Sequence, residues 1–170
     1  MKIARIVFLC AALAFMAVGA APDENVWSEK IDGYPVHIYV NPNAPADPAQ
    51  RSIIVLGMHS DKEAVKATTS LICPSTKRPY DIVIGTGNEG TTRELLRMRT
   101  EHKEPGPHAE AIKKGVEKVL KGPAVAGYLE VHSNGTPLGL AAFEIGAFRD
   151  VRKVDVMGPD TGYGGKHVEE

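Results

Sequence analysis

Two short apolar runs separated by a helical pattern organise the first half of the chain. Residues 52–58 (SIIVLGM) and 81–84 (DIVI) are rich in β-branched residues and almost continuously apolar, which is typical of strands covered on both faces. Between them, residues 61–72 show helical spacing at Ala64, Val65, Thr68, Leu71 and Ile72. A strand, a helix and a second strand in this order predict a βαβ unit with two parallel strands.

One strand precedes this unit and two helices follow it. Residues 36–40 (VHIYV) alternate at period two, the pattern of a strand with one covered face. After the second buried strand, residues 92–101 carry a thin apolar stripe and residues 107–121 a much stronger one. Gly122 and Pro123 supply the stop signal of the second helix. Its apolar face consists of Ala109, Ile112, Val116, Val119 and Leu120.

The period changes to two in the last third of the chain. Residues 128–132 (YLEVH) alternate, and the apolar residues 138–145 follow after Asn134 and Gly135. Asn-Gly is the pair that a type I′ hairpin turn favours, so these two segments predict an antiparallel hairpin. A last strand is predicted from Val151, Val154 and Val156.

These elements predict one domain over residues 21–158, of the α/β (mixed α+β) class. Its sheet is expected to be mixed, with one βαβ unit, three helices and a C-terminal antiparallel hairpin region. Residues 159–170 contain three glycines and no apolar pattern, so we expect a flexible Gly-rich tail there.

The first 20 residues have the three parts of a secretory signal peptide. Lys2 and Arg5 form a positive start, residues 6–18 are apolar and uncharged, and the sequence Val-Gly-Ala offers a cleavage site after Ala20. The apolar stretch is shorter than the roughly 20 residues that a membrane-spanning helix needs. We therefore expect a periplasmic or secreted protein with no membrane attachment after cleavage.

Removal of the signal leaves 150 residues, enough for a single domain with its own core, as a monomer or small oligomer. Because Lys2 and Arg5 leave with the signal, the formal net charge falls from −1 to −3, which disfavours nucleic acid and anionic membranes as partners. Cys10 also leaves, so Cys73 has no partner for an internal disulfide. The sequence favours a buried small hydrophobe at Cys73 over a reactive or intermolecular thiol.

Gly85, Gly87 and Gly90 follow the second buried strand at the spacing G-x-G-x-x-G. A dinucleotide-binding turn would start its helix at these glycines, but Thr91 and Glu94 form a capping box that starts the helix after them. No strand ends about 20 residues later with an acidic residue for the ribose, and two strands and a helix precede this one. The sequence therefore predicts no dinucleotide cofactor. A P-loop is excluded because no Gly-Lys-Ser/Thr follows.

A weaker hypothesis survives for the same turn. Backbone amides at the start of a helix favour an anion. The candidate ligand-binding residues are therefore Gly85, Thr86, Gly87, Asn88, Glu89 and Gly90. The simpler alternative is a strand-to-helix connection that needs a positive φ at one or two glycines.

A second turn leaves the first buried strand and enters a helix. Within it, Ser60 and Glu63 form another capping box. If the two strands are parallel neighbours, both turns lie at the carboxyl edge of the sheet, where open α/β sheets bind ligands. His59, Ser60 and Asp61 are the candidate catalytic residues, with His59 as the first candidate for a general base. Residues adjacent in sequence do not, however, have the spatial arrangement of a catalytic triad.

The six histidines predict no metal site. His108-Ala109-Glu110 resembles the His-x-Glu of zinc deaminases, but the Pro-Cys-x-x-Cys that those enzymes need downstream is absent. The histidines also show no i,i+4 pair and no H-E-x-x-H sequence.

Two classes of function remain. The first is an exported binding domain, of the inhibitor or immunity type, for another exported protein or for a small anionic ligand. The second is a metal-independent hydrolase or transferase with a site around His59 and the 85–90 turn. No cofactor is predicted for either class.

Overall fold

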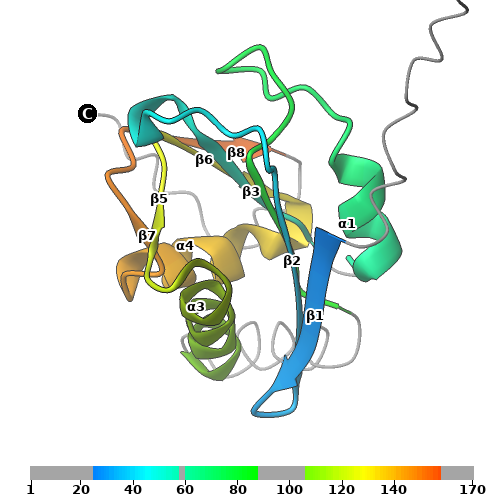
Figure 1. Ribbon diagram of the computed structural model, residues 1–170. Coiled ribbons are helices and arrows are strands. Elements are labelled where there is room, and N and C mark those ends of the chain that lie inside the picture. Colours follow the sequence, from blue (N-terminus) through cyan, green and yellow to red (C-terminus); the bar gives the residue numbers. More distant parts are fainter. Residues whose placement is uncertain (1–24, 58–59, 88–105, 158–170) are drawn as a thin grey trace, which may run out of the picture.

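Six strands form the central sheet: β1 (Val26–Ile31), β2 (Tyr34–Val40), β3 (Ser52–Val55), β4 (Ile82–Gly85), β6 (Tyr128–His132) and β8 (Lys153–Met157). The computed structural model describes residues 25–57, 60–87 and 106–157. The strand order is β1-β2-β4-β3-β6-β8 (Figure 1). β2 is antiparallel to both of its neighbours, whereas β4, β3, β6 and β8 run parallel. The predicted α/β domain with a mixed sheet is confirmed.

Three described helices cover the two faces of the sheet: α1 (Lys62–Thr68), α3 (Gly106–Leu120) and α4 (Thr136–Glu144). α1 packs on one face, and α3 and α4 pack on the other. Successive side chains of β3 serve both layers, because Ile53 and Val55 join the core under α3 and α4 while Ile54 packs with Val65 of α1. Every residue of β3 and β4 is buried, as expected for strands with two covered faces.

The predicted βαβ unit is formed by β3, α1 and β4. β3 and β4 are parallel neighbours, with Ile54 opposite Val83. The helix is shorter than the expected 61–72, because it ends at Thr68 and leaves Leu71 54% exposed. The hydroxyls of Thr68, Thr69 and Ser70 each bond to a carbonyl three or four residues earlier, and such local bonds compete with helix propagation.

α3 confirms the strongest helix prediction. Its buried face includes Ala109, Ile112 and Val116, at the expected positions, and Val119 and Leu120 pack at the margin of the same core. The close packing of this helix on the sheet depends on Gly115, where an added Cβ would lie 3.1 Å from Cγ1 of Val36.

The predicted antiparallel hairpin is wrong. The turn sequence forms a short 3-10 helix, η3 (Ser133–Gly135), and α4 replaces the expected returning strand. β6 pairs instead with β8, in parallel. Residues 138–145 are apolar at nearly every position, so periodicity could not separate strand from helix, and Pro137 fits the first turn of a helix.

A second, two-stranded parallel sheet was missed. It pairs β5 (Ala124–Val125) with β7 (Phe148–Arg149). Strands of two residues carry no periodic signal. The small sheet lies beside the C-terminal end of α3 and buries Phe148 in the core.

Several sequence expectations fall outside the described residues, namely the signal segment 1–20, the helix at 92–101 and the tail at 159–170. In the described part of the chain, no helix combines the length and the apolar character that crossing a membrane requires. Cys73 is buried and is not part of a disulfide, which confirms the small-hydrophobe interpretation.

Candidate functional site

The carboxyl edge of the sheet, where β3, β4 and β6 end, contains a topological switch point (Figure 1). From β3 the chain continues through α1 to β4, on one side of β3. From β6, on the other side of β3, it continues into α4 on the opposite face of the sheet. Because the two connections diverge, the ends of β3 and β6 border the position where open α/β sheets bind ligands.

A strained serine lies at the end of β6. Ser133 has a φ of 52°, in the left-handed region that residues other than glycine seldom adopt. It stands between a strand and a helix, within the sequence Val-His-Ser-Asn-Gly, and we call residues 131–135 the Ser133 turn. Its side chain is partly exposed, and no described residue hydrogen-bonds to its hydroxyl. A left-handed serine at a switch point, with a hydroxyl that no described residue hydrogen-bonds, is a candidate functional residue.

Two of the four other described non-glycine residues with a positive φ, Lys121 and Asp32, have ordinary explanations. Lys121 follows the last residue of α3, where helices commonly end in this conformation. Asp32 lies in the two-residue turn between β1 and β2, whose tight hairpin needs a positive φ. Ser133 alone among these three stands where a strand passes directly into a helix.

Gly135 brings the Ser133 turn against the end of β3. A Cβ added at this glycine would lie 2.3 Å from the carbonyl oxygen of Leu56 and 3.0 Å from Cα of Gly57. No real Cβ makes such a contact, so only glycine lets the two backbones approach this closely. The described residues of the chain that leaves β3, namely Leu56, Gly57, Ser60 and Asp61, are here called the β3 exit.

Replacement of Gly135 by alanine is expected to destabilise the fold. The added methyl overlaps the Leu56 carbonyl, and overpacking of this kind costs about 1–3 kcal/mol. Urea unfolding of the intact chain measures the change. Gly122→Ala is the matched control, because nothing lies within 4 Å of its added Cβ and its stability should stay within about 0.5 kcal/mol of the parent. Equal stabilities of the two variants would contradict the close approach.

The two turns proposed from the sequence lie side by side. The Thr86 amide donates to Oγ of Ser60 at 2.8 Å, and the Gly87 amide donates to the Ser60 carbonyl at 3.0 Å. Thr86 Oγ1 also lies 3.4 Å from the Gly57 carbonyl oxygen. The amides of residues 86 and 87 are therefore engaged with the β3 exit. Positions 88–90 of the proposed anion site lie outside the described residues.

Close approach also explains the described glycines of this turn. A Cβ at Gly85 would lie 2.5 Å from the Ser60 carbonyl oxygen, and Gly87 has a φ of 63°. These observations agree with the simpler alternative for the turn, a connection that needs glycine for its backbone geometry.

The candidate catalytic residues Ser60 and Asp61 have different structural roles. Asp61 is the N-cap of α1, and its carboxylate accepts from the Ala64 amide at 2.9 Å. The predicted Ser60 cap is therefore wrong by one residue, because the Ser60 hydroxyl is occupied by the Thr86 amide. His59 lies outside the described residues.

The described histidines at positions 37, 108 and 132 do not hydrogen-bond to Ser133. His108 is fully buried against the ring of Tyr34, at 4.8 Å between ring centroids, and its ring nitrogens have no hydrogen-bond partner in the described part of the chain. Burial lowers the pKa of His108 to about 4, although the nearby backbone of Pro35 and Thr86 opposes this shift. His37 bonds through Nδ1 to the Ser28 hydroxyl at 2.9 Å, and burial lowers its pKa as well.

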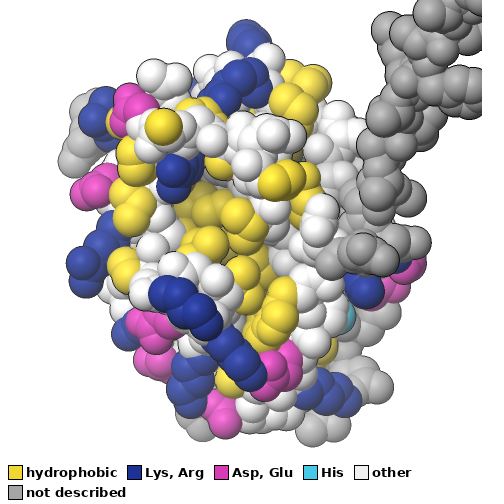
Figure 2. All heavy atoms as spheres, viewed as in Figure 1, with side chains coloured by type: hydrophobic (Ala, Val, Ile, Leu, Met, Phe, Trp, Pro, Cys, Tyr) yellow, Lys and Arg dark blue, Asp and Glu magenta, His cyan; other side chains and the backbone are white. Residues whose placement is uncertain are grey.

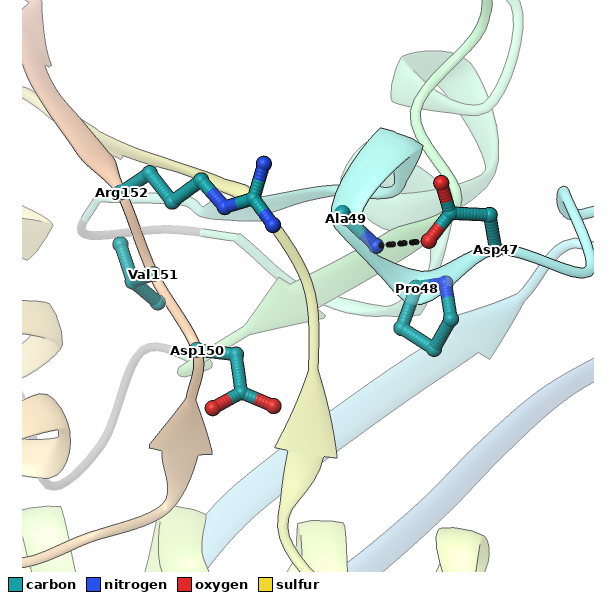
Figure 3. Close-up of a pocket in the computed structure, with 6 residues that line it drawn as sticks. All are labelled: Asp47, Pro48, Ala49, Asp150, Val151 and Arg152. Carbon is teal, nitrogen blue, oxygen red and sulfur yellow. Dashed lines mark hydrogen bonds between the residues drawn. The ribbon is translucent and has the colours of Figure 1, made fainter.

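An open pocket of about 440 Å³ lies at the opposite, amino edge of the sheet. It separates η2 (Pro48–Gln50) from the residues that lead into β8, and Figure 3 shows Arg152 reaching across it toward η2. The Asp47 carboxylate is engaged as the cap of η2, at 3.0 Å from the Ala49 amide. Figure 2 shows a further hollow where apolar side chains gather between charged ones. The lining of the pocket includes Asp150, which is also left-handed with a φ of 59°, but none of its lining residues is a serine, threonine or cysteine.

Ser133 was missed by the sequence prediction. The signal that could have found it is a serine with a small residue two positions later, between a strand and a helix. The hairpin interpretation of Asn134 and Gly135 hid this signal, because a nucleophile turn requires a helix to follow.

No protein-family model and no curated protein matches this sequence. Within the described residues, no group of three His, Cys, Asp or Glu side chains could hold a metal ion. Since a fold class does not determine a function, the chemistry has to be argued from the carboxyl edge itself.

Proposed function

We propose that this protein is a serine hydrolase that cleaves esters, with Ser133 as its nucleophile. The observation that carries the proposal is the φ of 52° at Ser133, on a turn that passes directly from β6 into a helix. In α/β hydrolases a serine in the sequence G-x-S-x-G stands on the same kind of strained strand-to-helix turn, which exposes its hydroxyl above the sheet. The proposal retains the hydrolase alternative from the sequence and moves the nucleophile to Ser133.

One departure from that sequence is compensated locally. The first glycine of G-x-S-x-G is replaced by Val131, whereas Gly135 keeps the second. Room for the valine comes from α4, because position 139 is also a glycine. A Cβ added there would lie 2.5 Å from Cγ1 of Val131 and 3.2 Å from Cβ of Val55. The larger residue on the strand is thus matched by the smallest residue on the helix.

The proposed reaction is acyl transfer through the serine. The Ser133 hydroxyl oxygen attacks the ester carbonyl carbon, its proton passes to a general base, and the alcohol leaves with a proton from that base. Water then attacks the acyl-serine and releases the carboxylic acid. The oxyanion formed in both steps needs backbone N–H donors, which in α/β hydrolases come from the residue after the serine and from the loop after a neighbouring strand.

The corresponding groups here are the amide of Asn134 and the β3 exit. Asn134 lies in the first turn of a helical segment that begins at Ser133, so its amide is not needed for an intrahelical bond. The β3 exit touches the Ser133 turn at Gly135. His59 remains the candidate base, because in sequence it stands two residues beyond Gly57, the residue that makes this contact.

Covalent labelling tests the proposal. The intact chain is treated with a fluorophosphonate, which phosphonylates activated serines, and the modified peptide is identified by mass spectrometry. We expect one adduct, on Ser133, and none in Ser133→Ala. Ser70→Ala removes an exposed serine and should label like the parent. Failure of Ser133 to react, or equal labelling of Ser133→Ala, would reject the serine hydrolase.

The exported binding domain is the alternative that would then remain. Its anion-binding form has less support, because the amides of Thr86 and Gly87 already donate to Ser60. Export through residues 1–20 is compatible with either function and would place the hydrolase in the periplasm or outside the cell.

A further inference from the structure

The exposed large apolar side chains of the described residues belong to β8 and to a segment that contacts it. Three lie on β8, and the other two precede Ser75 by three and four residues. The Ser75 hydroxyl donates to the Asp155 carboxylate of β8 at 3.0 Å, so this segment lies against the strand. We call these five side chains the β8 patch: Leu71, Ile72, Val154, Val156 and Met157.

The backbone of β8 has an edge that no described strand pairs with. β8 is the last strand in the sheet order, and β6 is its described neighbour. The Lys153 amide donates to the Gly127 carbonyl at 3.3 Å, on the β6 side. Because successive residues of a strand direct their N–H and C=O groups to opposite sides, those of Val154 and Val156 point outward. An edge of this kind can accept another strand.

The two faces of β8 carry different side chains. Val156 stands beside Val131 of β6, on the face that α3 and α4 cover. Val131 is fully buried, whereas Val156 is 46% exposed, so the apolar layer of the core extends to the edge of the sheet and is left partly uncovered there. On the other face, Lys153 and Asp155 form an ion pair at 2.9 Å.

Charge complementarity favours a second copy of this chain as the strand that fits this edge. When two identical strands pair antiparallel, the residue on the twofold axis faces its own copy. An axis at Lys153 or Asp155 would place like charges opposite each other, which is destabilising. An axis at Val156 would place Asp155 opposite Met157. An axis at Val154 uses outward backbone groups and places Lys153 of each copy opposite Asp155 of the other.

We infer that two copies of this protein associate through β8, as an antiparallel pair with Val154 on the twofold axis. The two sheets then form one continuous sheet, and the exposed valines of both copies come together on the face that carries α4. Strand addition of this kind combines backbone hydrogen bonds with contacts between side chains on alternate positions. The inference does not depend on the role of Ser133, so the labelling experiment has no bearing on it.

Two charge variants test the inference, because each should fail to pair alone and the two should pair when mixed. Lys153→Asp places carboxylates opposite each other, and Asp155→Lys places ammonium groups opposite each other. We expect either change to raise the dissociation constant of the dimer at least about tenfold, measured by sedimentation velocity on a concentration series of the full chain. An equimolar mixture should form dimers as tightly as the parent, since every opposed pair then has opposite charges.

Two further variants make the outcome decisive. Lys30→Asp makes the same charge change on β1, the other edge strand, and should dimerise like the parent. Lys153→Asp combined with Asp155→Lys exchanges the two charges and should also dimerise like the parent; if a single variant does not fold, failure of this combined variant overturns the inference. A parent that stays monomeric at every concentration overturns it too, and leaves a strand of another protein as the occupant of β8. Single variants that dimerise like the parent contradict the pairing.

Discussion

Replacing Ser133 by glycine is expected to abolish ester hydrolysis and to stabilise the fold at the same time. Loss of the nucleophile should lower kcat/KM by at least about 10⁴-fold. A left-handed backbone costs a residue with a Cβ about 1–2 kcal/mol, and glycine avoids this cost while losing about 0.5–1 kcal/mol through its greater freedom in the unfolded chain. The net gain should be about 1 kcal/mol, measured by urea unfolding alongside hydrolysis of p-nitrophenyl butyrate.

Two other variants separate the parts of this prediction. Ser133→Ala loses the hydroxyl but keeps the Cβ in the left-handed region, so it should be as inactive as the glycine variant without being more stable. Lys121→Gly relieves the left-handed φ of 61° at the end of α3, far along the chain from the turn, and should stabilise the protein with full activity. A Ser133→Gly protein that is less stable than Ser133→Ala would show that the turn is not strained.

Acidification from pH 6.5 to pH 4 is expected to remove about 3 kcal/mol of stability through His108 alone. Above pH 6.5 the ring is neutral in both the folded and the unfolded chain. Below that pH the unfolded chain binds a proton, whereas the pKa of about 4 keeps the folded ring neutral. Each pH unit in this window therefore favours unfolding by about 1.4 kcal/mol. Urea unfolding across the window gives the slope.

Comparison with variants isolates this contribution from that of the carboxylates. His108→Phe keeps a ring beside Tyr34 and cannot be protonated, so its stability should fall less steeply with acidification than that of the parent. His132→Gln, at an exposed position, should follow the parent. If His108→Phe and the parent lose stability in parallel between pH 6.5 and 4, the folded protein accommodates a charged His108.

Strands and helices could be predicted from the sequence where the pattern of apolar residues reflects which of their faces are buried. β3 and β4 are covered on both faces and contain almost only apolar residues, and α3 is covered on one face and shows the matching periodicity. α4 defeated the same method, because burial of Leu138, Gly139, Ala141 and Ala142 leaves little polar contrast along the helix. The Asn-Gly pair then favoured the wrong turn, since that preference is local and the helix is stabilised by contacts with β6.

The candidate site could be predicted as a region but not as a set of roles. Parallel β3 and β4 place both predicted turns at one edge, as expected from the βαβ unit. The partner of the Ser60 hydroxyl could not be foreseen, because either Ser60 or Asp61 is chemically able to cap α1. In the structure, Ser60 accepts from the buried amide of Thr86, and Asp61 caps α1. Nothing in the sequence around Ser60 points to Thr86 as its partner.

The contact between Val131 and Gly139 makes these two positions interdependent. The side chain of Val131 packs against the backbone of Gly139, and this contact sets the distance between α4 and β6. A related chain with glycine on the strand would have space for a methyl on the helix, whereas one with bulk at both positions would push α4 away from the serine. In related sequences we therefore expect a larger side chain at one of positions 131 and 139 to accompany a smaller one at the other. The combined volume of the two side chains should vary less than the volume of either one.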